Sequence, residues 1–381
     1  MMELFGDDMR REPYPLYDQL RPGSPMLMPG PNVWLVMDYE GVKRALHDTD
    51  AFTSAVGGKF EWLLFMDPPR HTRLRAIISK ALTPRQVAGL EPQVREIVRE
   101  LLDATGDELD LEAQVAAPLP IRVIAGLLGL PSVDRAQLER WGHAIMGLAA
   151  TVIGTPEAAV AAGTAFEAAN AEMAAYLGEL AHEKRARPAD DLLTRLVTSD
   201  EQLDELELLR FFQLLLAAGT ETTTNLIDNA MVCLLDHPAE MRRLRGAPEL
   251  VPSMIEEVLR FRCPAQAMFR GTRRAVELNG RTIPEGHLVL ALVGAANRDP
   301  QQFAEPARFD IARTPNAHVG FGHGIHFCLG AALARLEGRV AFEEMLARWS
   351  EIAYARSEPW PPRPPFHIHG PASLPLRVTS R

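Results

Sequence analysis

The longest apolar segment of the chain, residues 205–236, constrains the fold more than any other feature. Asp204 can cap the start of a helix and Glu207 can answer three residues later, which is the pattern of a capping box. The segment stops at His237-Pro238. About 32 helical residues at ~1.5 Å each span roughly 48 Å, enough to cross a whole domain. Its middle is apolar on nearly all sides, so we expect a central, buried helix.

The rest of the chain supports a mainly helical protein. From Arg70 to about His237 the apolar residues recur mostly at helical spacing, with Gly or Pro at the joints. Short extended segments occur only at 24–38, 276–293 and 366–378, and Asn279-Gly280 predicts a tight hairpin turn. The sequence therefore predicts a mainly α fold with small peripheral β-sheets, organised as one domain over residues 1–381.

Composition and charge exclude several classes of protein. With 47% apolar and 24% charged residues, the 381-residue chain is neither disordered nor fibrous. Its net charge of −10 gives no overall attraction to nucleic acid or to an anionic membrane. Residues 1–13 are too charged for a signal peptide, and no uncharged apolar run reaches the ~18 residues of a spanning helix. We expect a cytoplasmic monomer without a membrane anchor.

The segment 321–330, FGHGIHFCLG, carries the strongest chemical signal. It precedes a predicted helix over 331–349, so Cys328 lies just before a helix N-terminus, where backbone N–H groups and the helix dipole stabilise a thiolate. Gly322, Gly324 and Gly330 would let a flat ligand approach the backbone. Two other interpretations remain open at this point: a buried core cysteine, and a zinc site formed by His323, His326 and Cys328.

The pattern F-x-x-G-x-H-x-C-x-G resembles the haem-binding signature of the cytochrome P-450 family. Further segments resemble family motifs in the same order: DPPRHTRLR at 67–75, AGTETT at 218–223, the E-x-x-R at 257–260, and ANRDP at 296–300. The resemblance implies a single-domain cytochrome P-450 fold in which haem b lies between the long central helix and the helix after Cys328. Cys328 would be the ligand of the iron.

The resemblance also implies which residues hold the cofactor. His71 and Arg75 share one helix face, which taken alone is more often a solvated face, but the family assigns them, with Arg270 and His326, to the haem propionates. The complete set of expected cofactor contacts is His71, Arg75, Ala218, Gly219, Arg270, Phe321, Gly324, His326, Cys328 and Gly330.

The E-x-x-R segment predicts a structural ion pair. Both Glu256 and Glu257 are spaced to meet Arg260 on a helix, and spacing alone does not choose between them. The resemblance chooses Glu257 and implies a buried clamp behind the haem, with Arg308 or Arg313 as a third member.

The segment 218–224 of the long helix contains the expected catalytic pair. The Thr222 hydroxyl can bond back to the carbonyl of Ala218, and the polar run predicts a local opening of the helix. A charged Glu221 in an apolar helix costs free energy of folding, so we expect this carboxyl to have an ionic partner or a function. Such polar residues can also simply face a neighbouring loop. The resemblance implies that Glu221 and Thr222 deliver protons during dioxygen activation.

Substrate contacts are implied by position in the family. They are Phe60, Trp62, Leu64, Leu214, Ala217, Gln266, Met268 and Ile368, with 52–65 as a lid. Most are apolar, which favours a lipophilic substrate such as a terpenoid, steroid, fatty acid or polyketide.

The resemblance thus implies a monooxygenase that hydroxylates or epoxidises a lipophilic small molecule with O2. The sequence shows no flavin or iron–sulfur motif, so electrons would come from a separate ferredoxin and its reductase. We expect Arg70, Arg73, Arg75, Lys80, Arg335 and Arg339 to form basic patches for that partner, although each is equally compatible with an ordinary solvated face. A peroxide-driven peroxygenase and a non-catalytic haem sensor are the alternative functions.

Overall fold

The central element is α12 (Glu205–Asp236), which has the predicted length and bounds. The computed structural model describes residues 6–28, 32–56, 61–131, 135–148, 156–199, 201, 203–364 and 366–381. Asp204 accepts from the backbone N–H of Glu207, whose side chain answers, so the capping box is present. The helix ends at His237, and Pro238 begins the next helix because proline fits the first turn.

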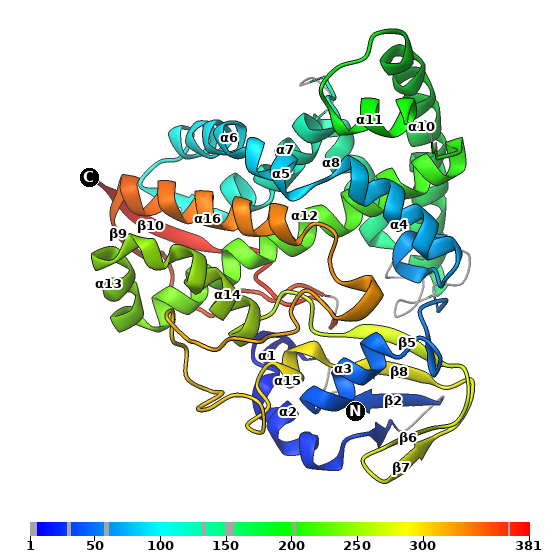
Figure 1. Cartoon of the computed structure of the whole chain (residues 1–381). Helices are drawn as coiled ribbons and strands as arrows, with labels where there is room; N and C mark the ends of the chain where they lie inside the picture. Colours follow the sequence, from blue (N-terminus) through cyan, green and yellow to red (C-terminus); the bar gives the residue numbers. More distant parts are fainter. Residues whose placement is uncertain are drawn as a thin grey trace.

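In chain order the other helices are α1 (Asp7–Arg11), α2 (Tyr14–Leu20), α3 (Tyr39–His47), α4 (Arg70–Ala81), α5 (Pro84–Gly89), α6 (Glu91–Asp103), α7 (Pro118–Leu128), α8 (Arg135–Gly147), α10 (Pro156–Ala186), α11 (Leu192–Thr198), α13 (Pro238–Gly246), α14 (Val251–Phe261), α15 (Val293–Ala296) and α16 (Ala331–Arg348). Helices α7, α8, α10, α13, α14 and α16 pack against α12, whereas α1, α2, α3 and α15 lie beside the sheet that contains β2 (Val33–Val36), β5 (Met268–Thr272) and β8 (Leu288–Ala291) (Figure 1). Short turns are η2 (Arg21–Gly23), η3 (Leu63–Phe65), the π-helical η4 (Glu112–Ala116), η6 (Pro248–Leu250) and η7 (Gly324–His326).

The strands form three small sheets outside the helical core, as the sequence predicts. One sheet has the order β1 (Met26–Leu27), β2 (Val33–Val36), β8 (Leu288–Ala291), β5 (Met268–Thr272) and β3 (Phe52–Thr53), with only β2 and β8 parallel. A second sheet joins β4 (Glu108–Asp110), β10 (Pro375–Ser380) and β9 (Trp349–Tyr354). The third is the hairpin of β6 (Val276–Leu278) and β7 (Arg281–Ile283).

The predicted hairpin turn is confirmed. Asn279 and Gly280 have φ values of 48° and 72°, and Leu278 pairs with Arg281 across them. Strands β3, β4, β5 and β9 are not predicted, because short edge strands are defined by partners far away in the sequence. The helix expected over 331–349 ends one residue earlier, since Trp349 begins β9.

The main hydrophobic core follows α12 and joins it to the surrounding helices. Ile227, Ala230 and Met231 of α12 are completely buried, and α7, α8, α14 and α16 pack against this helix. Figure 1 shows α16 running beside α12, with the loop before α16 at one end. Of the described helices, none is both long and apolar enough to cross a bilayer. The packing fixes the loop that carries Cys328 relative to the central helix.

Candidate active site

The loop before α16 holds Cys328 in a fixed backbone conformation. The Cys328 N–H donates to the carbonyl of Phe321 at 2.8 Å. Gly324 has a φ of 74°, and a Cβ there would lie 2.9 Å from the Cα of His47 in α3. Only glycine fits this position, because α3 packs directly on the loop. Gly324 therefore shapes the loop through α3, a packing role that its motif position does not reveal.

Two opposing effects set the electrostatics of Cys328. Burial raises the pKa of the Cys328 thiol, and the Gly330 N–H with the guanidinium groups of Arg75 and Arg335 only partly oppose this effect. The Gly330 N–H favours the anionic sulfur, as expected at a helix N-terminus, whereas desolvation favours the neutral thiol. A bound metal ion would reverse the balance, since a coordinating thiol loses its proton outright.

Four nitrogen-bearing side chains gather beside this loop and lack an anionic partner. The His71 and His326 rings lie 4.2 Å apart between centroids, and both ring nitrogens of His71 and Nε2 of His326 are buried without hydrogen-bond partners. Arg75 donates to the carbonyl of Phe327 at 2.5 Å, and Arg270 donates to that of Phe269 at 2.8 Å. Within the described residues neither arginine pairs with a carboxylate. We call His71, Arg75, Arg270 and His326 the cationic cradle.

The pKa values of the cradle reflect burial among like charges. Burial and the cationic side chains of His71, Arg270 and Arg75 lower the pKa of His326 to about 3. Burial lowers the pKa of Arg270 to about 10 and also lowers that of His71. Buried donors without acceptors are costly. The cradle therefore fits a group bearing carboxylates, such as the haem propionates.

The zinc alternative does not survive this geometry. His326 faces His71, whereas the His323 ring lies 5.6 Å from that of His47 in another direction. In the part of the chain that the structure describes, no three His, Cys, Asp or Glu side chains are close enough to share a metal ion. His323, His326 and Cys328 are therefore not a joint ligand set.

One face of α12 is exposed at the expected catalytic segment. Ala218 is exposed although its neighbours in the middle of α12 are partly or fully buried, and Thr222 donates its hydroxyl to the Ala218 carbonyl at 2.6 Å, as predicted. The predicted opening is wrong in that α12 is continuous: the hydroxyls bond one turn back without interrupting the helix. Gly219 faces α7, because a Cβ there would lie 2.9 Å from Cδ1 of Ile124.

Glu221 is mostly buried on α12 and has no hydrogen-bond partner for its Oε2 atom. Burial raises the pKa of this carboxyl, while the charge of Arg363 opposes the shift. Arg363 itself bonds to Asn225 at 2.8 Å and pairs with Glu112 at 2.5 Å. A carboxyl of this kind can retain a proton and pass it to a nearby hydroxyl or water.

The predicted substrate contacts are only partly brought together. Leu214 and Ala217 lie partly exposed on the α12 face that carries Ala218, and Trp62 donates its indole N–H to Gln213 of α12 at 3.1 Å. Leu64 is 43% exposed. The remaining predicted contacts are Met268, Ile368 and Phe60. Met268 lies near Gly322 in the cysteine loop, Ile368 bridges to Ala265, and Phe60 falls outside the described residues.

Gln266 is a wrong prediction. Its side chain is buried and donates to the Cys263 carbonyl at 2.6 Å and to the Tyr14 hydroxyl at 3.4 Å, and it packs over Gly294. These contacts turn the amide into the core beneath β5, so it cannot face a substrate.

The Glu257–Arg260 pair is completely buried. Arg260 donates to both carboxylate oxygens of Glu257 at 2.8 Å, and Arg313 donates to the same carboxylate at 3.1 Å. The Asp310 N–H and the Asn316 amide complete its hydrogen bonds. Because all these hydrogen bonds are made, the cost of burying the two charges is offset.

The structure thereby decides two choices that spacing left open. The third side chain of the clamp is Arg313, whereas Arg308 contributes only its backbone carbonyl to Arg260. Glu256 instead pairs with Arg335 at 2.6 Å and with His318 at 3.1 Å.

The predicted basic patches are largely neutralised. Each cation except Arg75 pairs with a carboxylate of a different element: Arg70 with Glu61, Arg73 with Glu207, Lys80 with Glu201, Arg335 with Glu256, and Arg339 with Glu91. Arg339 also pairs with Glu343 of its own helix. The sequence showed the cations but not these distant partners. Most of the charge expected in these basic patches is therefore balanced within the chain.

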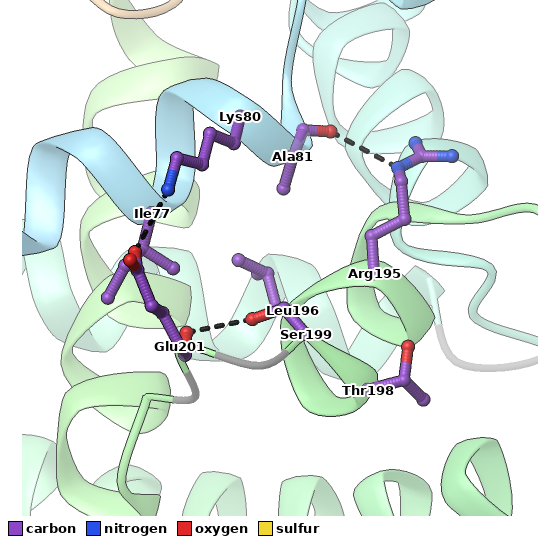
Figure 2. A pocket seen from close by; sticks show the side chains of 8 residues that line it. All are labelled: Ile77, Lys80, Ala81, Arg195, Leu196, Thr198, Ser199 and Glu201. Carbon is purple, nitrogen blue, oxygen red and sulfur yellow. Dashed lines mark hydrogen bonds and ion pairs between the residues drawn. The ribbon is translucent and has the colours of Figure 1, made fainter.

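A recess of about 410 Å³ lies between α4 and α11, away from the cysteine loop (Figure 2). Its polar groups bond to one another: Arg195 to the Ala81 carbonyl at 3.2 Å, Lys80 to Glu201 at 3.0 Å, and Ser199 to the Glu201 carbonyl at 2.7 Å. None of its lining residues belongs to the cradle or to the exposed face of α12. It is therefore separate from the candidate site.

Sequence reasoning missed two polar residues in the first half of α12. Gln213 is fully buried and accepts from Trp62 and from Arg210, each at 3.1 Å, while its amide donates to Asn170 of α10 at 2.7 Å. The signal was available, since a Gln and an Arg interrupt an otherwise apolar helical run.

Together, a cysteine loop, a cationic cradle and a central helix with an exposed Ala218 form the arrangement expected of a haem-binding protein. The family model of cytochrome P-450 matches residues 161–372. The cytochrome P-450 monooxygenase PikC of Streptomyces venezuelae is 40% identical over 398 residues, covering 98% of this chain and 92% of that protein. The mycinamicin IV hydroxylase/epoxidase of Micromonospora griseorubida is 42% identical over 338 residues, covering 84% and 82%.

Solved structures agree with these relatives. CYP109E1 of Bacillus megaterium, crystallised with testosterone, superposes with a TM-score of 0.88 at 36% identity, covering 96% of this chain and 99% of that one. The chain therefore belongs to the cytochrome P-450 family, and it is an oxidoreductase of the monooxygenase type with a haem cofactor.

A first prediction concerns the cradle. Arg270→Ala removes a buried donor for a propionate, and a charge-assisted hydrogen bond of this kind is worth about 1.5–3 kcal/mol. We expect faster transfer of haem to an acceptor protein, with substrate preference unchanged. Arg274→Ala, an exposed cation just beyond the same strand, is the matched control and should behave as wild type. Equal transfer rates for both variants would remove Arg270 from the cradle.

Proposed function

We propose that the protein uses haem b to hydroxylate or epoxidise a lipophilic small molecule with O2, taking electrons from a separate ferredoxin and its reductase. One observation carries the proposal: the cationic cradle, which has no carboxylate partner among the described residues, lies beside a glycine-framed cysteine, in a fold whose central helix exposes Ala218 and part of Thr222. Haem, when bound, supplies the activation of dioxygen.

The chain's own residues bind and orient that cofactor. Cys328 would ligate the iron, while His71, Arg75, Arg270 and His326 would hold the carboxylates. The small, exposed side chain of Ala218 would leave room for the cofactor beside α12. The Glu257–Arg260 clamp keeps the segment before the cysteine loop in place, because Arg260 also holds the carbonyls of residues 297, 306 and 308.

Proton delivery is assigned to Thr222 and Glu221. The Thr222 hydroxyl donates to Ala218 and can accept a hydrogen bond from water at the exposed face of α12. The raised pKa of Glu221 keeps this carboxyl a proton donor at a higher pH than an exposed glutamate would be. A peroxide-driven enzyme does not need this acid–alcohol pair, which favours the dioxygen route.

A lipophilic substrate is supported by the lining and by the relatives. Leu214 and Ala217 present apolar surface beside Ala218. The names of relatives refer to mycinamicin IV and vitamin D(3), and CYP109E1 was crystallised with testosterone. A ferredoxin is supported by cysteine usage, because this chain has three cysteines and an iron–sulfur cluster takes four.

The proposal is tested by the absorption spectrum of the reduced holoprotein under carbon monoxide. A strongly red-shifted Soret band is the expected result, since thiolate ligation donates electron density to the iron. Turnover with ferredoxin, its reductase and O2 should then exceed turnover with hydrogen peroxide. An unshifted band would overturn the haem-thiolate assignment, and faster peroxide turnover would favour the peroxygenase.

A second prediction separates the roles of the catalytic pair. Thr222→Val keeps the shape and removes the hydroxyl, so haem content and substrate binding should persist while consumed oxygen is released as hydrogen peroxide. Glu221→Gln removes a proton source and should slow the whole cycle by roughly 10²–10⁴. Oxygen uptake, peroxide and product are measured together. Unchanged stoichiometry in Thr222→Val would show that this hydroxyl is not an essential relay.

A further inference from the structure

Arg210 is a cation on the same face of α12 as the catalytic segment, about two turns before Ala218. Counting from Arg210, Leu214 is four residues on, Ala217 seven and Ala218 eight, and Glu221 is eleven, so all share one side of the helix. These residues are partly or fully exposed, whereas Phe211 and Phe212 beside Arg210 are buried. The exposed stripe therefore begins with a guanidinium and ends at the proposed proton donors.

The hydrogen bonding of Arg210 is incomplete. Its Nη1 donates to the Gln213 side-chain oxygen at 3.1 Å, an acceptor that Trp62 also uses. Its Nε is buried and has no partner. A guanidinium carries five N–H donors, so one shared bond to a neutral amide leaves most of its capacity unused.

No carboxylate of the described chain neutralises Arg210. The nearest acid along its own helix is Glu207, one turn earlier, and this side chain is engaged with Arg73 and with the capping box of Asp204. A partly buried cation without an anion costs free energy of folding. The planar guanidinium group is suited to bind a carboxylate through two parallel hydrogen bonds.

The spacing along α12 sets the size of a matching ligand. Eight residues separate Arg210 from Ala218 and twelve separate it from Thr222, which corresponds to about 12 and 18 Å of helix. With carbon–carbon bonds of about 1.5 Å in a zigzag, an extended chain of roughly 10–14 carbons spans that distance. The side chains between the two ends of this stripe, Leu214 and Ala217, are apolar.

We propose that Arg210 anchors the carboxylate of a long-chain aliphatic acid and thereby places carbons near the far end of the chain beside Ala218 and Thr222. This inference rests on the proposed monooxygenase function and names its substrate class. Arg210 is a positioning residue: it binds the end of the substrate that does not react. Gln213, held by Trp62 and Asn170, fixes the guanidinium in the required orientation.

The test compares an acid with its neutral ester on the same holoprotein. Binding of tetradecanoate and of methyl tetradecanoate is measured by equilibrium dialysis and by the change in haem spin state. Arg210→Gln should weaken binding of the acid roughly 10-fold or more, because a charge-assisted bidentate pair is lost, and should leave the ester unchanged. Arg210→Lys should restore part of the affinity. The exposed Arg242→Gln is the control and should change neither.

Product analysis supplies a second readout. Wild type should hydroxylate tetradecanoate at a narrow set of carbons near the methyl end, and Arg210→Gln should broaden that set. Equal weakening of acid and ester would show a merely structural role through Gln213, and no change in either would show that Arg210 binds no carboxylate; both results overturn the inference. If the protein lacks the thiolate spectrum altogether, the proposed function fails instead.

Discussion

Cys328→Ala should abolish both the red-shifted carbonyl band and substrate oxidation. The effect is expected to be complete, because no other sulfur lies in the loop between Phe321 and α16, and neither the backbone groups nor the histidines of this loop can supply a thiolate. The fold should persist, since Cys328 is only partly buried and its backbone bond to Phe321 does not need the side chain. Far-ultraviolet circular dichroism and the reduced carbonyl spectrum of the same sample measure the two properties.

The other two cysteines provide matched controls. Cys233 and Cys263 are buried in the hydrophobic core, Cys233 within α12 and Cys263 just after α14, and neither belongs to the glycine-framed loop before α16. Cys233→Ala and Cys263→Ala should therefore retain the carbonyl band. A normal band in Cys328→Ala, or its loss in either control, would contradict the ligand assignment.

Glu257→Ala should destabilise the protein by about 3–5 kcal/mol, because removal of one member of a buried ion pair leaves an uncompensated charge. Here Arg260 and Arg313 would both lose their carboxylate while remaining in the interior. The Asp310 N–H and the Asn316 amide would lose an acceptor as well. Urea unfolding of the haem-loaded protein measures the change, and the yield of holoprotein should fall with it.

Glu256 is the neighbouring control for this experiment. It is partly exposed and paired with Arg335, which is itself 40% exposed, so Glu256→Ala should cost no more than about 1 kcal/mol. Where Glu257→Ala does not accumulate, Glu257→Gln preserves the volume and several hydrogen bonds and should give an intermediate loss. Equal stability for the variants at 256 and 257 would contradict the clamp.

Local features of the fold were predictable because their causes are local. The capping box of Asp204 and Glu207, the turn at Asn279-Gly280 and the bond from Thr222 to Ala218 depend on residues at most a few positions apart. Backbone preferences and short side-chain reach decide such features, and tertiary contacts then agree with them.

The features that were missed depend on partners far away in the sequence. Glu207, for example, neutralises Arg73 from another helix. The choice of Arg313 over Arg308 as the partner of Glu257 stayed open for the same reason, because the segment after α15 meets Glu257 only in the folded chain. The Gln266 amide donates a hydrogen bond to the hydroxyl of Tyr14, near the N-terminus. A sequence shows which charges and amides exist, but folding decides which of them meet, and motifs report only the pairs that a family shares.

The closed ion pairs of α4 and α16 have a consequence for how a redox partner arrives. Charges that are already matched add little long-range field of their own, so these cations should not raise the encounter rate above the unsteered value of roughly 10⁵–10⁶ M⁻¹ s⁻¹. Discrimination between partners then rests on the lifetime of the complex rather than on the speed of its formation. Phe327, next to Cys328, is 41% exposed. How closely a redox partner packs against this aromatic ring would then determine the lifetime of the complex.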